Sequence, residues 1–304
     1  MIVSITGGSG FIGKLLVAAH IQSGDEVRVL SRHKLGEING VRYFQSDLSK
    51  SDIDVYDFVE GVEILYHCAG EINDESLMRK IHLDGTKQLV EASQGQVGRW
   101  VQLSSTGVYG PNRFGVVTEE SPERPSGVYE QTKAEADKIV KMSGIPYVIL
   151  RPTNVFGQTM HNQSLFQLIN MVRKGFFHYI GGVGALVNYV NVKDVVDALV
   201  MCGIDDSALG NTYILSQTTE VEQMVESFSS GLDIERKTFR LPELLIRQLT
   251  RVFGWLPGFP LTVSRIDSLT GYCRYDSTKI IDELGFEFHL SLESRFVEFS
   301  SKVS

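Results

Sequence analysis

The chain has 304 residues, of which 42% are hydrophobic and 22% charged, so it is long enough for one large or two modest domains and is not a disordered chain. Its formal net charge is −8, which argues against a protein that binds nucleic acids or anionic membranes, because such proteins carry an excess of positive charge. Three widely spaced cysteines, no signal-peptide pattern and no apolar run near the ~18 residues of a membrane span predict a cytoplasmic protein without disulfides or a zinc site.

The first predicted element is a short buried strand over residues 1–5, followed by a turn and a helix over 11–22. The turn carries four glycines, Gly7, Gly8, Gly10 and Gly13. A glycine turn lets the backbone approach a phosphate closely, and the start of a helix offers free N–H groups and a positive dipole end. The strand before and the helix after favour a pyrophosphate site of a dinucleotide over a plain strand–helix turn.

The second predicted strand, over 26–30, bears on which dinucleotide binds. An Asp or Glu after this strand usually meets the free 2′-hydroxyl of NAD, but here the chain continues as Ser31, Arg32, His33 and Lys34. Such a cationic cluster suits the 2′-phosphate of NADP, which we prefer to NAD, although a solvated basic loop would have the same composition. Asp47, after a strand over 41–45, is placed to meet the adenine amino group.

Strands and helices alternate through the first half of the chain. We predict strands over 63–70, 99–105 and 146–152, with helices over 74–94 and 128–144. This alternation predicts an α/β fold of the Rossmann type, with a doubly wound parallel sheet whose ligands lie beyond the carboxyl ends of the strands.

The pattern is less regular after residue 155, where we predict a smaller α/β substrate-binding cap. The dinucleotide-binding domain then comprises residues 1–155 and returns near 185–216, where LVNYVNV and TYIL are expected to rejoin the main sheet. The cap comprises residues 156–184 and 217–304.

Two short stretches, SSTGVYG (104–110) and YEQTK (129–133), carry the predicted chemistry. Tyr129 and Lys133 are four residues apart on a helix and so share one face, and Ser105 ends a neighbouring strand. An ammonium group near the phenol is expected to lower its pKa from ~10, which would let Tyr129 exchange a proton near neutral pH. With a serine hydroxyl on the same substrate oxygen, this set suits hydride transfer at a carbonyl or carbinol carbon.

At these motifs the chain resembles the extended short-chain dehydrogenases/reductases, in the group of nucleotide-sugar epimerases, dehydratases and ketoreductases. The resemblance covers most of the chain, at TGGSGFIG (6–13), HCAG (67–70), HLDGT (82–86), SSTGVYG (104–110), YEQTK (129–133), RPTNVFG (151–157), YVNVKDVVDAL (189–199) and YDSTKIIDELGF (275–286). It implies that Ser105, Tyr129 and Lys133 are the catalytic set, that Lys133 also holds the nicotinamide ribose, and that the protein is a homodimer through the helices near 74–94 and 128–143.

We predict the ligand contacts on this basis. The cofactor would contact Gly7, Gly10, Phe11, Ile12, Arg32, Asp47, Leu48, Ala69, Tyr129 and Lys133. A nucleotide-diphosphate sugar would contact Thr106, Asn154, Asn162 and Arg274. Arg274 suits a diphosphate, but it could equally pair with Asp276.

The chain also departs from the family pattern. Dehydratases of this group carry an Asp-Glu pair directly after the catalytic hydroxyl residue, where this chain has Thr106 and Gly107. Without that acid and base, elimination of water lacks its proton donor and acceptor, which argues against a 4,6-dehydratase. The usual Asn before GT is His82, which we interpret as a packing residue, and the usual His before the DV turn is Asn191.

Several functions stay open at this point. A 4-ketoreductase consumes NADPH, whereas a 4-epimerase regenerates its bound cofactor, and the cations at Arg32 favour the ketoreductase. The resemblance of the cap to sugar ketoreductases of surface-polysaccharide pathways points the same way. A reductase of a flavonoid- or steroid-like carbonyl and a non-catalytic NADP sensor are the alternatives.

Overall fold

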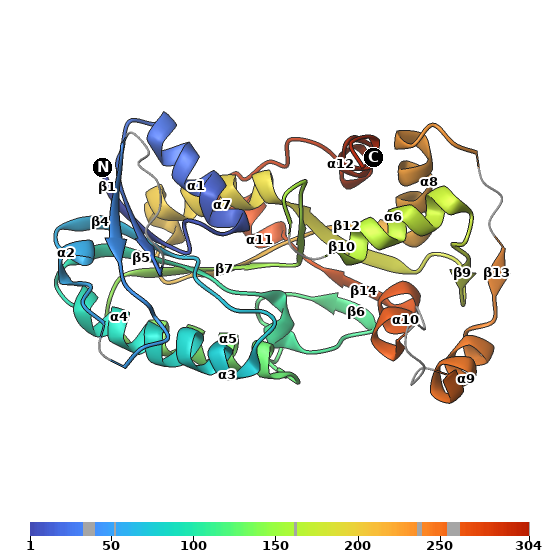
Figure 1. Ribbon diagram of the computed structural model, residues 1–304, viewed down its shortest axis with the longest axis horizontal. Helices are drawn as coiled ribbons and strands as arrows, with labels where there is room; N and C mark the ends of the chain where they lie inside the picture. Colours follow the sequence, from blue (N-terminus) through green and yellow to red (C-terminus); the bar gives the residue numbers. More distant parts are fainter. Residues whose placement is uncertain (33–39, 52, 161–162, 236–238, 254–261, 304) are drawn as a thin grey trace.

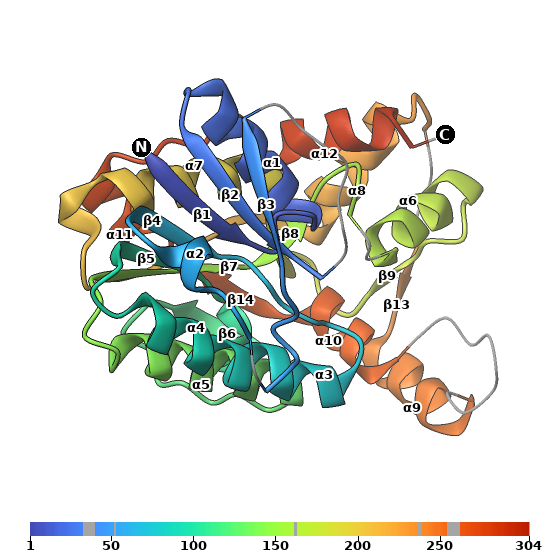
Figure 2. The same cartoon turned by 60° about the vertical axis from the view of Figure 1, so that its left-hand side comes forward.

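The computed structural model describes residues 1–32, 40–51, 53–160, 163–235, 239–253 and 262–303 (Figures 1 and 2). Its main feature is a seven-stranded sheet in the order β11-β7-β5-β4-β1-β2-β3, in which every neighbouring pair is parallel. The strands are β1 (Ile2–Thr6), β2 (Glu26–Ser31), β3 (Val41–Gln45), β4 (Val62–His67), β5 (Val97–Leu103), β7 (Tyr147–Pro152) and β11 (Thr212–Leu215). The predicted Rossmann-type sheet is confirmed.

Helices cover both faces of the sheet, because its strands are apolar on both sides. Figure 1 shows α1 and α7 on one face and α3, α4 and α5 on the other. The helices run over α1 (Phe11–Gln22), α2 (Tyr56–Val59), α3 (Glu75–Arg79), α4 (Thr86–Ser93), α5 (Val128–Lys141) and α7 (Val192–Ile204). A π-helix, η1 (Lys80–Gly85), joins α3 to α4, so the predicted helix over 74–94 exists but is not uniformly α-helical. No described helix is long and apolar enough to cross a membrane.

A second, smaller group of elements follows β7 along the chain. Its three-stranded sheet has the order β12-β10-β8, and α6, α8 and α12 surround it with a separate apolar core. These elements are β8 (Asn154–Phe156), α6 (Ser164–Lys174), β10 (Leu186–Asn191), β12 (Gln217–Glu220), α8 (Val221–Gly231) and α12 (Leu292–Ser301). The remaining elements are η2 (Thr106–Tyr109), β6 (Phe114–Val117), β9 (Tyr179–Ile180), η3 (Asp206–Ala208), β13 (Arg240–Leu241), α9 (Glu243–Phe253), α10 (Val263–Thr270), β14 (Tyr272–Tyr275) and α11 (Thr278–Leu284).

One prediction about the sheet is right and one is wrong. TYIL forms β11 and pairs with β7 in the main sheet, as predicted. LVNYVN forms β10, which does not rejoin that sheet but pairs with β8 and β12. The reason is that β11 takes the edge beside β7, while β8 leaves the main sheet and offers β10 a parallel partner elsewhere.

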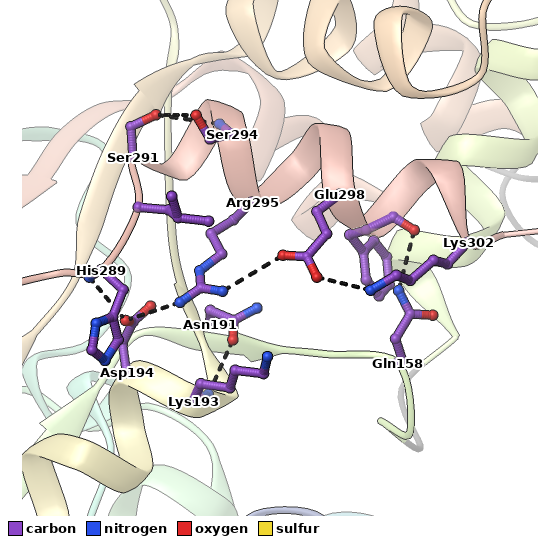
Figure 3. A network of polar contacts seen from close by, with 12 residues as sticks. Gln158, Asn191, Lys193, Asp194, His289, Ser291, Ser294, Arg295, Glu298 and Lys302 are labelled. Carbon is purple, nitrogen blue, oxygen red and sulfur yellow. Dashed lines mark hydrogen bonds and ion pairs between the residues drawn. The ribbon is translucent and has the colours of Figure 1, made fainter.

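A buried ion pair joins the two groups of elements (Figure 3). Arg295 of α12 lies 3.3 Å from Asp194 of α7, and the two side chains are 5% and 0% exposed. From Arg295 the polar contacts lead through Glu298 to Lys302 at the surface (Figure 3). Because the fully buried Asp194 pairs with a charge on the other helix, the pair helps to fix α12 against α7.

Candidate active site

The glycine turn after β1 is built for a close backbone approach. The N–H of Gly10 donates to the carbonyl of Gly7 at 2.9 Å, and Gly7 has a φ of +70°, a conformation that favours glycine. A Cβ at Gly13 would lie 2.1 Å from the Gly7 oxygen, so this helix position also needs glycine. Gly10 is the N-cap of α1 and offers no capping side chain, which leaves the first N–H groups of the helix available to an anion. The turn therefore fits the pyrophosphate of a dinucleotide.

The predicted adenosine contacts follow β2 and β3. Arg32 is exposed, and its charge acts on Asp47. Burial raises the pKa of Asp47, but hydrogen bonds from Ser49 and the charge of Arg32 lower it overall. Asp47 already accepts bonds from the Ser49 N–H at 3.0 Å and the Ser49 hydroxyl at 2.8 Å, so it caps its own turn. His33 and Lys34 lie outside the described residues.

Four further residues are predicted to contact the cofactor, and all are buried or half-buried: Phe11, Ile12, Leu48 and Ala69. Ala69 is half-buried, and its N–H donates to Thr6 at 3.1 Å. Leu48 is buried in one apolar cluster of the main sheet, and the half-buried Ile12 packs against another. The ring of Phe11 packs towards the second core, beside the Cα of Gly157.

The structure brings the three predicted catalytic side chains to the carboxyl end of β5. Ser105 follows this strand and is the N-cap of η2, where its hydroxyl accepts a bond from the Gly107 N–H at 3.0 Å. It also hydrogen-bonds the phenol of Tyr129, in the first turn of α5. One turn further, the buried Lys133 donates from Nζ to the Leu103 carbonyl at 2.9 Å. A serine hydroxyl, a phenol and an ammonium group therefore all lie at the carboxyl end of β5.

The expectation that the pKa of Tyr129 is lowered is wrong. Burial raises the pKa of Tyr129 to about 12, and the hydrogen bond from Ser105 offsets only part of this effect. The nearby charges of Glu130 and Asp137 raise it further. Lys133 does not reverse this balance, because burial lowers its own pKa and its amine is directed at the Leu103 carbonyl.

A buried ion pair below the site was missed by the sequence analysis. Asp137, two turns after Tyr129, accepts hydrogen bonds from Ser104 at 2.8 Å and from two nitrogens of Arg151 at 2.8 and 3.1 Å. Ser104 is the residue before Ser105, so Asp137 ties the end of β5 to α5. The signal was available, because Asp137 is one turn beyond Lys133 on the helical face that carries the chemistry.

His82 lies beside the candidate catalytic tyrosine, in the π-helix η1. Its ring is 5.7 Å from that of Tyr129 in an edge-on arrangement, and it is 1% exposed. Burial, followed by the charges of Lys133 and His67, lowers the pKa of His82 to about 2, so the ring is neutral. The interpretation as a packing residue is correct for its burial, but the ring also makes two hydrogen bonds at the site.

The predicted substrate-binding residues differ in their exposure and in the partners that they already have. Thr106 is buried and its hydroxyl donates to the Pro152 carbonyl at 3.3 Å, whereas Asn154 is exposed and donates to the Asn188 carbonyl at 3.1 Å. Arg274 is 53% exposed and lies 3.8 Å from Asp276, so the ion pair that competes with a diphosphate is present. Asn162 lies outside the described residues. Asn191 caps α7 by accepting from the Lys193 N–H at 3.0 Å, a structural position.

A Rossmann-type sheet with this glycine turn, together with serine, tyrosine and lysine at its carboxyl edge, defines an extended short-chain dehydrogenase/reductase. Residues 3–213 match the family model described as the NAD dependent epimerase/dehydratase family. The chain belongs to this family.

The chain is similar to several known members. It is 27% identical over 333 residues to the dTDP-glucose 4,6-dehydratase of Streptomyces niveus, covering 98% of this chain and 91% of the relative. It is 30% identical over 235 residues to sterol demethylase protein B of Methylococcus capsulatus, covering 71% and 70%. A short-chain dehydrogenase/reductase superfamily protein from Agrobacterium tumefaciens, solved with bound NAD, shares the fold with a TM-score of 0.76 and 19% identity, covering 100% and 97%.

Proposed function

We propose that this enzyme reduces the 4-keto group of a nucleotide-diphosphate sugar with NADPH. The observation that carries the proposal is the contact between Ser105 and Tyr129, one helical turn from Lys133, at the sheet edge that the glycine turn faces. Relatives that act on dTDP-glucose and structural neighbours solved as UDP-sugar epimerases support the substrate class.

A bound nicotinamide would supply the hydride, and the chain's own residues would handle the proton. Because the pKa of Tyr129 is raised to about 12, the phenol holds its proton at neutral pH and is set to donate it to a carbonyl oxygen. The hydroxyl of Ser105 would hydrogen-bond the same oxygen and fix its position. Lys133 would hold the ribose of the cofactor.

Three features separate the candidate reactions. Thr106 and Gly107 stand where dehydratases carry an acid and a base, which argues against elimination of water even though one relative is a dTDP-glucose 4,6-dehydratase. Arg32, exposed after β2, favours a 2′-phosphate and so a consumed NADPH. A 4-epimerase that retains NAD is the second candidate.

The proposal extends to the setting of the enzyme. We infer a cytoplasmic homodimer of surface-polysaccharide biosynthesis, joined through the helices near 74–94 and 128–143, with residues 156–184 and 217–304 as the substrate cap. The similarity to sterol demethylase protein B supports one alternative, a reductase of a non-sugar, steroid-like carbonyl. A sensor that binds NADP without chemistry is the other alternative.

The first experiment is to denature freshly purified protein, identify any nicotinamide nucleotide released, and titrate the emptied protein with NADPH and NADH. An empty site that binds NADPH far more tightly than NADH supports the ketoreductase. Tightly held NAD with no preference for the phosphate supports the epimerase and overturns the role of Arg32. Oxidation of NADPH by UDP- and dTDP-4-keto-6-deoxyhexoses, absent from the variant Tyr129→Phe, then separates an enzyme from a sensor.

A further inference from the structure

Glu130 is a half-buried carboxylate at the candidate active site that neither the catalytic set nor the predicted contacts include. It follows Tyr129 in the first turn of α5. In the described part of the chain, its carboxylate makes no hydrogen bond and no ion pair. A half-buried carboxylate in the first turn of a helix, with no side-chain partner of its own, is available to accept hydrogen bonds from a ligand.

Two glycines make the space that Glu130 occupies. A Cβ at Gly107 would lie 2.8 Å from Cγ of Glu130, and a Cβ at Gly127 would lie 2.3 Å from its Oε2. Neither glycine is required by the backbone, because Gly107 has no positive φ and Gly127 is extended with φ −97° and ψ 168°. The three atoms nearest to a Cβ at Gly127 all belong to Glu130, and the atom nearest to a Cβ at Gly107 is Cγ of Glu130, so a side chain at either position would displace this glutamate.

The same space adjoins the reacting groups. The Cβ position at Gly107 lies 3.3 Å from the hydroxyl of Ser105 and 3.8 Å from Oε1 of Glu130. The charge of Glu130 is also close enough to Tyr129 to raise the pKa of the phenol. Glu130, on α5, therefore places a carboxylate in the space beside Gly107, which itself has no side chain.

We propose that Glu130 is a substrate-binding residue whose carboxylate accepts a hydrogen bond from a hydroxyl group on the sugar, next to the carbon that reacts. This inference rests on the proposed function. A carboxylate is an acceptor only, so it selects a hydroxyl donor and repels the diphosphate, which must lie away from it. Glu130 thus contributes to recognition of the sugar, whereas Ser105 and Tyr129 act on the carbonyl oxygen.

The test measures the affinity that the sugar adds to the nucleotide. Calorimetry compares UDP-glucose with UDP, and dTDP-glucose with dTDP, for the wild type, Glu130→Ala, Glu130→Gln and the matched control Glu135→Gln, an exposed glutamate on the same helix. We expect Glu130→Ala to lose about 10- to 100-fold of the added affinity, the range of a hydrogen bond to a charged group, and Glu130→Gln to lose part of it. Glu135→Gln keeps it, and NADPH binds all four proteins equally.

A second variant tests the space itself. Gly107→Ala places a methyl group against Glu130, so it should weaken sugar binding in the wild type. In the Glu130→Ala background the same change should cost nothing further, since the side chain that it displaces is gone. Equal losses in both backgrounds would show that Gly107 acts on something else and would overturn the inference.

The remaining outcomes distinguish the inference from the function on which it rests. If Glu130→Ala keeps the full added affinity while the wild type oxidises NADPH with 4-keto-6-deoxyhexoses, the inference is wrong and the proposed function stands. If the wild type binds no nucleotide sugar better than the nucleotide and oxidises no NADPH with those sugars, the proposed function fails and the inference with it.

Discussion

Nδ1 of His82 and the hydroxyl oxygen of Thr132 are joined by a hydrogen bond of 2.8 Å, and the surrounding bonds fix which tautomer the histidine adopts. Nε2 of the ring accepts from the Glu71 N–H at 2.9 Å, so the proton must be on Nδ1. His82 then donates to Thr132, whose own hydroxyl donates to the Tyr129 carbonyl at 3.0 Å. The ring thereby connects the loop after β4 to the turn of α5 that carries the phenol.

This relationship predicts different effects for two substitutions. His82→Asn can accept from Glu71 and donate to Thr132, so we expect turnover close to that of the wild type. His82→Leu leaves the Glu71 N–H without its acceptor and removes the donor to Thr132, which should cost about 1–3 kcal/mol of stability and reduce kcat. Thermal melts and NADPH turnover provide the measurement. A fully active and stable His82→Leu variant would show that the two bonds do not position Tyr129.

The raised pKa of Tyr129 predicts how reduction depends on pH. The protonated phenol is the donor, and a pKa near 12 keeps it protonated, so the Tyr129 step should be flat from about pH 6 to 10. The reverse oxidation needs the phenolate and should speed up as pH rises. Initial rates in both directions check the sign. Tyr129→Phe should lose about 10²- to 10⁴-fold in kcat while it retains NADPH binding. A reduction rate that falls through neutral pH would mean that bound ligand lowers the pKa of Tyr129.

The buried pair of Asp137 and Arg151 predicts a loss of both stability and activity. The two side chains are 1% and 2% exposed, so Arg151→Met leaves the carboxylate of Asp137 without its counter-charge. Breaking such a pair costs about 3–5 kcal/mol, and here it also loosens Ser104 beside Ser105. Chemical denaturation and turnover measure the two effects. The double variant Asp137→Leu with Arg151→Met should recover part of the stability, because the carboxylate and the guanidinium are then removed together.

Arg32 predicts the choice of cofactor. Replacing it with aspartate should weaken NADPH binding much more than NADH binding, because it removes a cation and adds a repulsive charge opposite the 2′-phosphate. Fluorescence titration with both nucleotides gives the ratio of the two dissociation constants. Lys50→Gln, a nearby cation that follows β3, is the control and should leave this ratio unchanged. If the ratio of the two dissociation constants is unchanged in Arg32→Asp, the 2′-phosphate of NADPH must be bound by other residues.

The contacts in Figure 3 predict that two ion pairs of one network contribute differently to the free energy of unfolding. Arg295→Met leaves the fully buried Asp194 uncompensated and should cost about 3–5 kcal/mol of unfolding free energy. Lys302→Gln removes an exposed pair with Glu298, where both side chains are at least 40% exposed, and should change stability very little. Equal effects in urea unfolding would mean that the buried pair is already satisfied by other groups.

The sequence predicts most of the main sheet and the proximity of Ser105 to Tyr129, because both follow local patterns. The glycine spacing after β1 and the four-residue step from Tyr129 to Lys133 are readable without a partner strand. The position of β10 was predicted wrongly, since its pairing with β8 and β12 joins segments far apart in the chain, which local pattern does not encode. The raised pKa of Tyr129 was missed because burial depends on the whole fold.

The site also contains contacts that only three-dimensional proximity reveals. Asp137 and Arg151 are 14 residues apart, and no spacing rule joins a helix to the strand that follows it. His82 could be singled out as a departure from the family pattern, but its two hydrogen-bond partners, Glu71 and Thr132, lie 11 and 50 residues away in the chain. The roles of Arg32, Asn154 and Arg274 stay predictions.

The two apolar cores are interleaved along the chain, and this has a consequence for biosynthesis. The core of the main sheet takes residues from Val3 to Leu215 and again from Ile280 to Phe286, whereas the second core is completed by Leu292, Phe296 and Phe299. Neither core is therefore finished until the segment beyond Ile280 has left the ribosome. Folding of the last helices should be the closing event for both, so a chain that stalls or is cut a few dozen residues early would expose two unfinished apolar surfaces at once to chaperones and proteases.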